Sequence, residues 1–425
     1  MAPNKFLFFI IALLLSLEIH SIYGVTDTND AAALQSLKDS WRNTPPSWAK
    51  SNDPCQDWEG VSCNNSRVTA LDFSFNKGLT GSLSPRLGDL QKLSVLILAG
   101  CSFTGNIPDE LGNLADLSFL ALNSNNFSGR IPTSLGKLSK FHFNKNQLSG
   151  SISPQLFSYD MVLIHVFLDG NQLTGTIPDS LGSVQTLEVL RLDRNDLSDK
   201  VPSNLNNLTN LNELNLAHNN FTGPIPDLSL MNSLNYVDLS NNSFDPSEAP
   251  IWFSTLPSLT TLVMEFGSLE GRVPEKLFSF SQIQQVKLRN NMFNGSFSFG
   301  DSFGSQLSLV DLENNQITSV TLSSSYTNSL MAPSFRDLSS VTLFHSIEMS
   351  LWVQLNLTPG SVFLQNPFFN TDDYLQVHLA LFPSPRKNFN ESEVERIGLQ
   401  LSKQTYKPPK EFGPYYFIAS PYAFH

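Results

Sequence analysis

The residues with the clearest capacity for chemistry lie in Gly300-Asp-Ser302-Phe-Gly304, which matches the Gly-x-Ser-x-Gly pattern around a nucleophilic serine. Asp337 and His345 follow in the order in which some hydrolases place their acid and base. That pattern needs a sharp turn between a strand and a helix. The surrounding periodicity places Ser302 in a loop between two repeated segments instead, so we interpret the match as a coincidence.

Other catalytic patterns are weaker still. Gly136-Lys137 resembles the end of a phosphate-binding loop, but Ile131 stands where the first glycine of that loop belongs. The seven histidines show no metal-ligand spacing, and His142 and His218 are expected to be plain surface residues. No protein-kinase motif occurs in the chain. We therefore predict no catalytic residue, no metal site and no cofactor.

The three cysteines are predicted to be structural. Cys55 and Cys63 are close in sequence and precede the first repeated segment, so in an oxidising compartment they are expected to form a disulfide. Cys101 is left over, and it occupies a repeat position where cysteine is an accepted alternative to asparagine. A redox role for Cys101 is the less favoured interpretation.

The chain has the features of a secreted protein. Lys5 precedes an apolar run from Phe6 to Leu17, which predicts a signal peptide over residues 1–24; a retained membrane anchor is disfavoured because the run is short. No later segment reaches 18 consecutive apolar residues. The net charge of −12, without any Lys/Arg-rich run, argues against a nucleic-acid partner. Eight Asn-x-Ser/Thr sites predict N-glycosylation, at Asn64, Asn126, Asn207, Asn220, Asn241, Asn294, Asn356 and Asn390.

A leucine-rich frame recurs roughly every 24 residues along most of the chain. One register reads Leu211-x-x-Leu214-x-Leu216-x-x-Asn219, followed by Phe221, Gly223 and Ile225-Pro226. Eleven positions are equivalent to Asn219, namely Asn76, Cys101, Asn125, Asn146, Asn171, Asn195, Asn219, Asn242, Gly267, Asn291 and Asn315. A period of this length is the signature of a leucine-rich repeat solenoid. Its strands stack in parallel, and its buried asparagines satisfy the backbone where the chain leaves each strand.

The second half of most repeats reads as in Leu173-Thr-Gly175-Thr-Ile177-Pro178, which resembles the plant-type leucine-rich repeats of receptor kinases and receptor-like proteins. We therefore predict an α/β leucine-rich repeat solenoid of about 11 repeats over residues 67–320. Residues 25–66, with Trp41, Trp48 and Trp58, resemble the N-terminal cap of that family. Residues 321–335 are expected to be a linker. Residues 336–425 are expected to be a small α+β region, with helices at 338–351 and 390–402 and strands at 361–364 and 374–382.

Three further segments, Val189 to Asn195, Leu205 to Leu214 and Tyr406 to Tyr415, resemble one subfamily of plant receptor-like kinases, which includes a hydrogen-peroxide-sensing receptor. That resemblance implies plasma-membrane relatives with a Ser/Thr kinase, whereas this chain reaches His425 without either a membrane helix or a kinase. A cysteine-rich segment of those relatives is absent, and the fourth repeat is short, with 21 residues from Asn125 to Asn146. Peroxide sensing is therefore not transferred to this chain.

The outward residues of the strands are the candidate ligand contacts, because a solenoid leaves its concave face open. We predict an exposed aromatic with paired charges at Phe167, Asp169, Arg191, Asp193 and Arg194, and further contacts at Glu265, Phe266, Lys287 and Arg289. A solvated strand face with salt bridges between repeats is the alternative interpretation. Glycans at Asn126, Asn220 and Asn241 are expected to crowd the same face.

The functional hypothesis is an extracellular receptor-like protein that binds a peptide, a glycan or a protein ectodomain through its concave face. It would signal only through a partner such as a membrane co-receptor kinase. Two alternatives remain open: a truncated product of a receptor-kinase gene, and an inhibitor of a cell-wall hydrolase.

Overall fold

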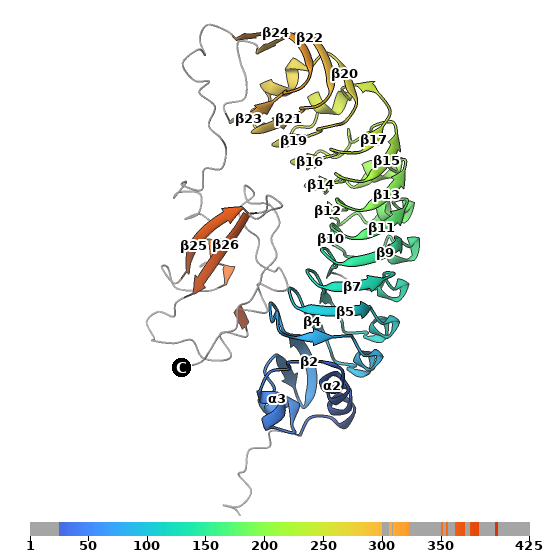
Figure 1. Ribbon diagram of the computed structural model, residues 1–425, viewed down its shortest axis with the longest axis vertical. Coiled ribbons are helices and arrows are strands. Elements are labelled where there is room, and N and C mark those ends of the chain that lie inside the picture. The colour runs from blue at the N-terminus through green and yellow to red at the C-terminus, as the bar shows by residue number, and fades with distance from the viewer. Residues whose placement is uncertain are drawn as a thin grey trace, which may run out of the picture.

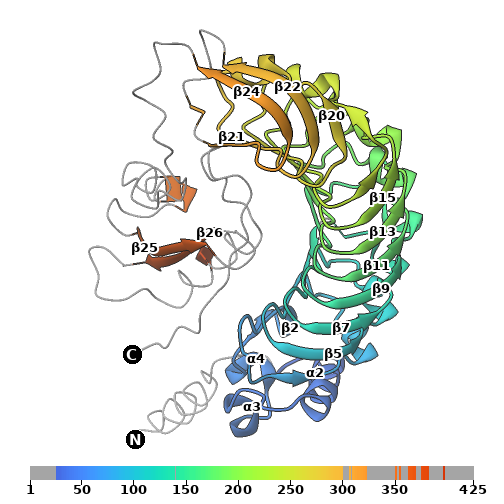
Figure 2. The ribbon, with the colours of Figure 1, turned by 45° about the horizontal axis from the view of Figure 1, so that its top comes forward.

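The fold was analysed in a computed structural model of the 425-residue chain. The structure describes residues 25–138, 140–299, 306–307, 309–322, 350–351, 354–355, 362–369, 375–381 and 396–397. The expected signal peptide, Ser302 and the expected helix over residues 390–402 lie wholly or mostly outside these residues. Within them the chain forms a curved solenoid, and Figures 1 and 2 show its arc from the N-terminal helices to β24.

The inner, concave side of the arc is a 12-stranded sheet. Its first strand pairs antiparallel with the second, and the eleven strands that follow the cap pair in parallel, one from each repeat. The strands are β1 Val61–Asn64, β2 Arg67–Asp72, β4 Val95–Ile97, β6 Phe119–Ala121, β8 Lys140–His142, β10 His165–Phe167, β12 Val189–Arg191, β14 Glu213–Asn215, β16 Tyr236–Asp238, β19 Thr261–Val263, β21 Gln285–Lys287 and β23 Leu309–Asp311. The short fourth repeat still contributes a complete strand, because β8 pairs in register with both neighbours.

A second layer of short parallel strands runs along one flank. It comprises β3 Thr80–Gly81, β5 Ser102–Asn106, β7 Asn126–Gly129, β9 Gln147–Ser151, β11 Gln172–Gly175, β13 Asp196–Asp199, β15 Asn220–Gly223 and β17 Ser243–Phe244. Four more strands continue it as a separate sheet: β18 Ser247–Glu248, β20 Leu269–Gly271, β22 Met292–Phe299 and β24 Gln316–Leu322. The leucines and phenylalanines between the two layers form one continuous core.

Short 3-10 helices complete eight of the coils in the described residues. They begin at or directly after a proline in most repeats, because proline fixes an extended entry and lacks the N–H that a first turn would leave unpaired. They are η1 Pro85–Asp89, η2 Asp109–Asn113, η3 Thr133–Leu135, η4 Pro154–Leu156, η5 Asp179–Ser183, η6 Ser203–Asn207, η7 Ile251–Ser254 and η8 Glu275–Ser279. The fourth repeat is short at its 3-10 helix. Its helix η3 has three residues, whereas η2 of the preceding repeat has five.

The repeated asparagines form the predicted ladder. Asn195 is typical: its Oδ1 accepts from the Leu173 amide at 3.0 Å, and its Nδ2 donates to the carbonyls of Leu168 and Leu192 at 3.0 and 3.1 Å. Cys101 takes the same place with its Sγ 3.1 Å from the Phe73 carbonyl oxygen. Burial raises the pKa of this thiol to about 12, so it stays protonated and belongs to the scaffold.

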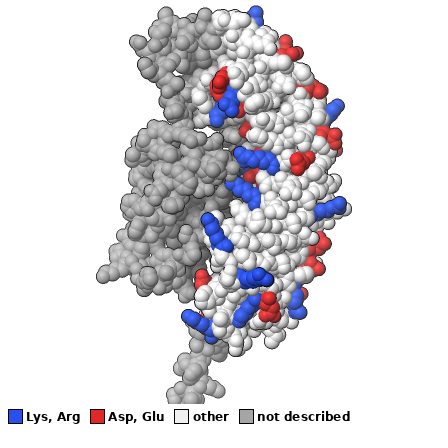
Figure 3. Space-filling view, in the orientation of Figure 1, with Lys and Arg blue, Asp and Glu red and all other residues white. Residues whose placement is uncertain are grey.

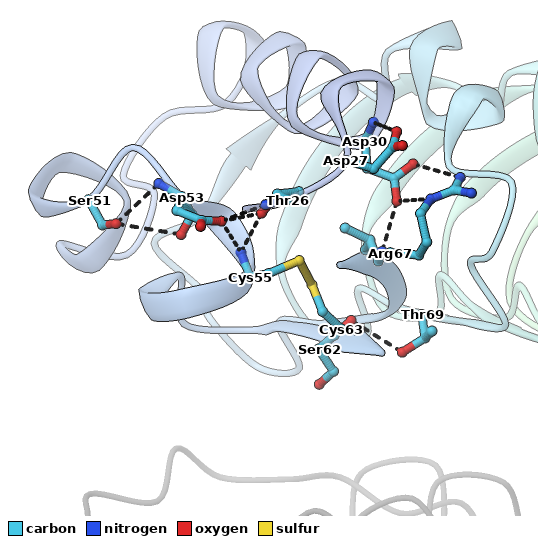
Figure 4. Close-up of a disulfide and its surroundings, with 11 residues drawn as sticks. Thr26, Asp27, Asp30, Ser51, Asp53, Cys55, Ser62, Cys63, Arg67 and Thr69 are labelled. Atoms are coloured by element: carbon cyan, nitrogen blue, oxygen red, sulfur yellow. Dashed lines mark hydrogen bonds and ion pairs between the residues drawn. A yellow bond between two sulfur atoms is a disulfide. The ribbon is translucent and has the colours of Figure 1, made fainter. Parts of the chain in front are cut away.

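The N-terminal end is sealed by α2 Thr28–Ser40, α3 Ser47–Lys50 and α4 Pro54–Asp57. Trp48 is fully buried and stacks between Trp41 and Trp58, with ring centroids 5.8 and 4.3 Å apart. The Cys55–Cys63 disulfide is formed as predicted, joining α4 to β1 (Figure 4). Buried Asp30 of α2 accepts from Arg67 Nε and Nη2 at 3.0 Å each, which fixes the cap to the first repeat strand. The tryptophans are therefore packing residues of the cap.

The described C-terminal residues include an antiparallel hairpin of β25 Val362–Phe369 and β26 Leu375–Leu381. Two strands were predicted in this part of the chain, close to these positions. Both ribbon views place the hairpin on the concave side of the arc (Figures 1 and 2).

Candidate ligand-binding surface

Strand register arranges the outward side chains of the concave sheet in columns. One column runs through Val95, Phe119, His165, Glu213 and Thr261, and its neighbour lies two residues further along each strand. Each step along a column is about 4.8 Å, the spacing of paired strands. The predicted ligand contacts fall in two groups on these columns, one near β10 and β12 and one near β19 and β21.

The first group centres on a cluster of aromatic rings in contact. His142 lies 5.2 Å from Phe119 and 4.7 Å from Phe167, measured between ring centroids. The guanidinium carbon of Arg191 lies 5.2 Å from the Phe167 ring centroid, within the range of a cation–π contact. Arg191 also forms a two-point ion pair with Glu213 of the next strand. The side chains therefore contact one another across five strands, from β6 to β14.

This arrangement corrects several predictions. Phe167 was expected to be an exposed aromatic and His142 a surface residue, but their side chains are 3% and 2% exposed. Asp169 and Asp193 were expected to face outward, yet both are buried. The two aspartates take the second position after the end of the strand, which is also buried in other repeats, where it carries the small residues Ala99, Asn123 and Ser240. Simple alternation does not hold past the end of each three-residue strand.

The buried carboxyl groups of Asp169 and Asp193 both have raised pKa values. Burial raises the pKa of Asp169 to about 6, partly offset by Arg191 and Lys145. Burial and then the charge of Asp169 raise the pKa of Asp193 to about 8, despite Arg194, whose Nη1 lies 3.4 Å from Asp193 Oδ2. Within the described part of the chain, Oδ1 of each carboxyl has no hydrogen-bond partner. Desolvation thus favours the neutral acids.

His142 is buried among the same group. Desolvation, followed by the charge of His165, lowers its pKa well below the usual value, so the ring is neutral. Among the residues that the structure describes, no group of three or more His, Cys, Asp or Glu side chains is placed to hold a metal ion. The cluster offers stacking and ion pairing, with no evident nucleophile.

The second group is more open. Arg289 Nε lies 3.0 Å from Glu265 Oε2, and the Arg289 side chain is 42% exposed. Phe266 is 48% exposed, an unusual environment for a large aromatic side chain. Lys287 pairs in register with Val263 on one side and Asp311 on the other, and it is partly exposed. Four predicted contact residues therefore lie on an accessible surface that combines an aromatic ring with charges of both signs.

The left-handed backbone positions shape the edge of this face. In all eleven repeats the residue before the ladder position has a positive φ, and nine of these residues are not glycine, including Arg194 at 53° and Phe266 at 51°. This conformation turns the chain sharply and directs Arg194 and Phe266 to the rim of the concave sheet. Sequence reasoning missed the feature because only Gly100 and Gly170 carry the residue type that normally signals it.

The predicted crowding by glycans needs correction for two sites. Asn126 and Asn220 are exposed, but they begin β7 and β15 of the second layer and do not lie on the concave sheet. Asn241 lies at the rim, with its Nδ2 3.5 Å from His218 Nε2. Sugars on Asn126 and Asn220 would therefore cover the flank and leave the concave columns clear.

Surface charge is mixed. Acidic and basic side chains are interspersed over the face that Figure 3 shows. A shallow groove of about 480 Å³ lies beside the concave strands, where Val162, Glu188 and Asn212 line the loops that lead into β10, β12 and β14. Sequence reasoning also missed Phe119 and Glu213, although both occupy a column that the repeat frame defines.

No described helix is both long enough and apolar enough to cross a membrane. The family model for the leucine rich repeat N-terminal domain matches residues 27–64. The model for the leucine rich repeat matches residues 92–114, 116–138, 162–184, 186–208 and 210–230.

The chain is 40% identical to a probable leucine-rich repeat receptor-like protein kinase of Arabidopsis thaliana, over 97% of this chain and 57% of that protein. It therefore spans little more than half the length of this relative. The ectodomain of the Arabidopsis receptor kinase HAESA, solved with the peptide hormone IDA and the co-receptor SERK1, is 28% identical with a TM-score of 0.55, covering 68% of this chain and 54% of the other.

A plant ice-binding protein is 26% identical with a TM-score of 0.58, and it is covered over 99% of its length against 69% of this chain. The same solenoid therefore serves more than one kind of recognition. The paired sheets, the asparagine ladder, the cap and these similarities all indicate the same repeat architecture. The chain is a leucine-rich repeat protein with the N-terminal domain of that family, and its repeats are of the type found in plant receptor ectodomains.

Proposed function

We propose that this chain is an extracellular recognition protein that binds a peptide or protein ligand through the open part of its concave face, around Glu265, Phe266, Lys287 and Arg289, and performs no catalysis itself. The observation that carries this proposal is Phe266. A large ring that is 48% exposed beside a charged pair is the composition of a binding hot spot.

The similarity to receptor ectodomains favours a peptide ligand. The HAESA structure contains a peptide hormone and a co-receptor. An extended peptide along the columns of this chain would meet Phe266 at the rim, Lys287 at the end of β21 and Arg289 just after it. Lys287 is partly exposed at the end of β21, and the Arg289 side chain, two residues further on, is 42% exposed beside Glu265.

The first group of predicted contacts, near β10 and β12, has a different role in this proposal. Phe167, Asp169 and Asp193 are buried, and Arg191 is paired with Glu213. Only Arg194 of that group is largely exposed, with 43% of its side chain accessible. We assign Phe167, Asp169, Arg191 and Asp193 to the internal support of the face and leave Arg194 as a candidate contact at its rim.

The test is selection from a displayed library of random linear peptides by the purified mature chain. The wild type is compared with Lys287→Glu/Arg289→Glu, and with Arg130→Glu/Lys200→Glu as a control for the charge change, since both control residues are exposed on the flank. Peptides enriched by the wild type and by the control, but reduced about tenfold with Lys287→Glu/Arg289→Glu, are the expected result. Equal enrichment by all three proteins would refute the proposed site.

A second candidate is supported by the 40% identical relative, a probable receptor-like kinase that extends well beyond the matched region. In this case the recognition surface would be the ligand-binding part of a membrane receptor. The distinguishing observation is a transcript that continues past His425 into an apolar segment of about 20 residues and a kinase. A stop codon directly after His425 in every transcript would exclude it.

A further inference from the structure

The concave face changes character along its length. From β4 to β14 most outward residues are buried: Val95, Phe119 and Val189 are 1%, 4% and 1% exposed, and only Lys140 and Arg191 are partly exposed. From β16 onward the same column carries Tyr236, Thr261 and Gln285, which are all partly exposed. The outer face of a sheet stays accessible unless something packs on it, because each side chain otherwise touches only its neighbours along the column.

The buried part is also the apolar part. Ala70, Val95, Ile97, Ala99, Phe119 and Ala121 form a hydrophobic cluster that is separate from the core between the two layers. The neighbouring rings of His142 and Phe167 extend it toward β12. A soluble protein rarely leaves an apolar area of this kind uncovered, and it marks a surface for packing.

We propose that the concave surface from β4 to β14 is an intramolecular docking surface for the C-terminal region of the same chain, residues 336–425. This proposal does not depend on the ligand or on the proposed function. It explains why most of the outward residues are buried in one half of a uniform solenoid face and partly exposed in the other.

Position and burial support this occupant. The β25–β26 hairpin lies on the concave side of the arc in two views that differ by 45° (Figures 1 and 2). Leu351, Leu355 and Ile397 are all nearly inaccessible to solvent, and none of them belongs to the solenoid core. Arg396 Nη1 donates to the Leu355 carbonyl at 2.9 Å, which joins two parts of the region that are 41 residues apart. These few described residues are therefore packed against other parts of the chain and are not exposed to solvent.

The size of the surface also suits the length of the C-terminal region. Strands β4 to β14 are six neighbours in the sheet, and they span about 25 Å at about 4.8 Å for each step. A compact unit of about 90 residues has a radius of gyration near 12 Å and is therefore about 30 Å across. The C-terminal region is large enough to cover this surface and too small to cover the whole arc.

The first test measures cysteine labelling in the full mature chain. Phe119→Cys and Thr261→Cys place a thiol in the same column, on the covered and open halves respectively. The background is low, because Cys101 is buried with a pKa raised to about 12, and Cys55 and Cys63 are joined. We expect maleimide to react at least about tenfold more slowly at position 119 than at 261. Equal rates would overturn the proposal.

The second test perturbs the surface and observes the occupant. Phe119→Asp introduces a charge into the covered half, and Thr261→Asp is the matched control in the same column. Amide exchange in β25 and β26 should accelerate by about tenfold or more with Phe119→Asp alone, while β19 and β21 exchange as in the wild type. Unchanged exchange of the hairpin in a folded Phe119→Asp chain would also overturn the proposal. If that variant does not fold, the labelling rates decide.

Discussion

Arg191 of β12 donates from Nε and Nη2 to the two carboxylate oxygens of Glu213 on β14, with Nη2 and Oε2 3.1 Å apart. Only 12% and 10% of the two side chains are exposed. Two parallel hydrogen bonds between charged groups are stronger and more specific than a single contact. The pair therefore links adjacent repeats and is not freely available to a ligand.

Breaking this pair should destabilise the solenoid. Glu213→Gln keeps the shape of the side chain but leaves a largely buried guanidinium without its counter-charge, and we expect it to lower the free energy of unfolding by about 2–4 kcal/mol. Asp116→Asn removes the partner of Lys92 in an exposed pair and should cost less than about 1 kcal/mol. Urea unfolding measures both. Equal losses would show that the pair at Arg191 behaves like a surface contact.

Stability should fall as the pH rises. The pKa of Asp169 is about 6 and that of Asp193 about 8 in the folded chain, against 3.8 for an ordinary aspartate. The folded state therefore holds more protons than the unfolded state between about pH 4 and 8, and loses stability across that range. The groups that face the two acids are Arg191, Lys145 and Arg194, together with Asp238.

The matched comparison uses Asp193→Asn, because asparagine is accepted at the same place in other repeats, as at Asn123 and Asn144. Its urea midpoint should decline less between pH 5 and 8.5 than that of the wild type. Asp196→Asn, at an exposed residue on the flank, should retain the wild-type slope. A wild-type slope in Asp193→Asn would disprove the proposed effect of burial at this position.

The ladder should be sensitive to single substitutions. Asn219 Oδ1 accepts from the Leu197 amide at 3.1 Å, and its Nδ2 donates to the Leu192 carbonyl at 2.9 Å. Asn219→Ala would leave these buried backbone groups unpaired, at a cost of about 2–4 kcal/mol by thermal or urea unfolding. Exposed Asn232→Ala is the control and should change stability by less than about 0.5 kcal/mol. Similar effects of both substitutions would contradict the structural role of the ladder.

Much of the scaffold is predictable because it repeats. Eleven equivalents of Asn219 define the strand order and the ladder, and the interpretation of Cys101 as scaffold follows from its place in that series. The disulfide at Cys55 and Cys63 was predicted from their spacing before the first repeat. Each of these features depends on local sequence or on contacts with the adjacent repeat.

The candidate surface was only partly predictable. Phe167 and Phe266 look equivalent in the sequence, since both are aromatic residues near the end of a concave strand, yet one is buried and the other is exposed. Their difference depends on register, on the left-handed turn at Phe266 and on what packs across the face. The turn belongs to the repeat frame, whereas the register and the packing across the face depend on contacts beyond a single repeat. Asp169 and Asp193 show the same limit, because alternation predicts outward side chains only within the strand.

The most direct test of the proposed recognition surface is hydroxyl-radical footprinting of the mature chain, with and without a peptide enriched by library selection. Phe266 reports on the concave rim, and Met292, 37% exposed on the flank, is an internal control. We predict that bound peptide slows oxidation of Phe266 at least about threefold and leaves Met292 unchanged. Protection of Met292 with full reactivity at Phe266 would contradict the account and place the ligand on the flank.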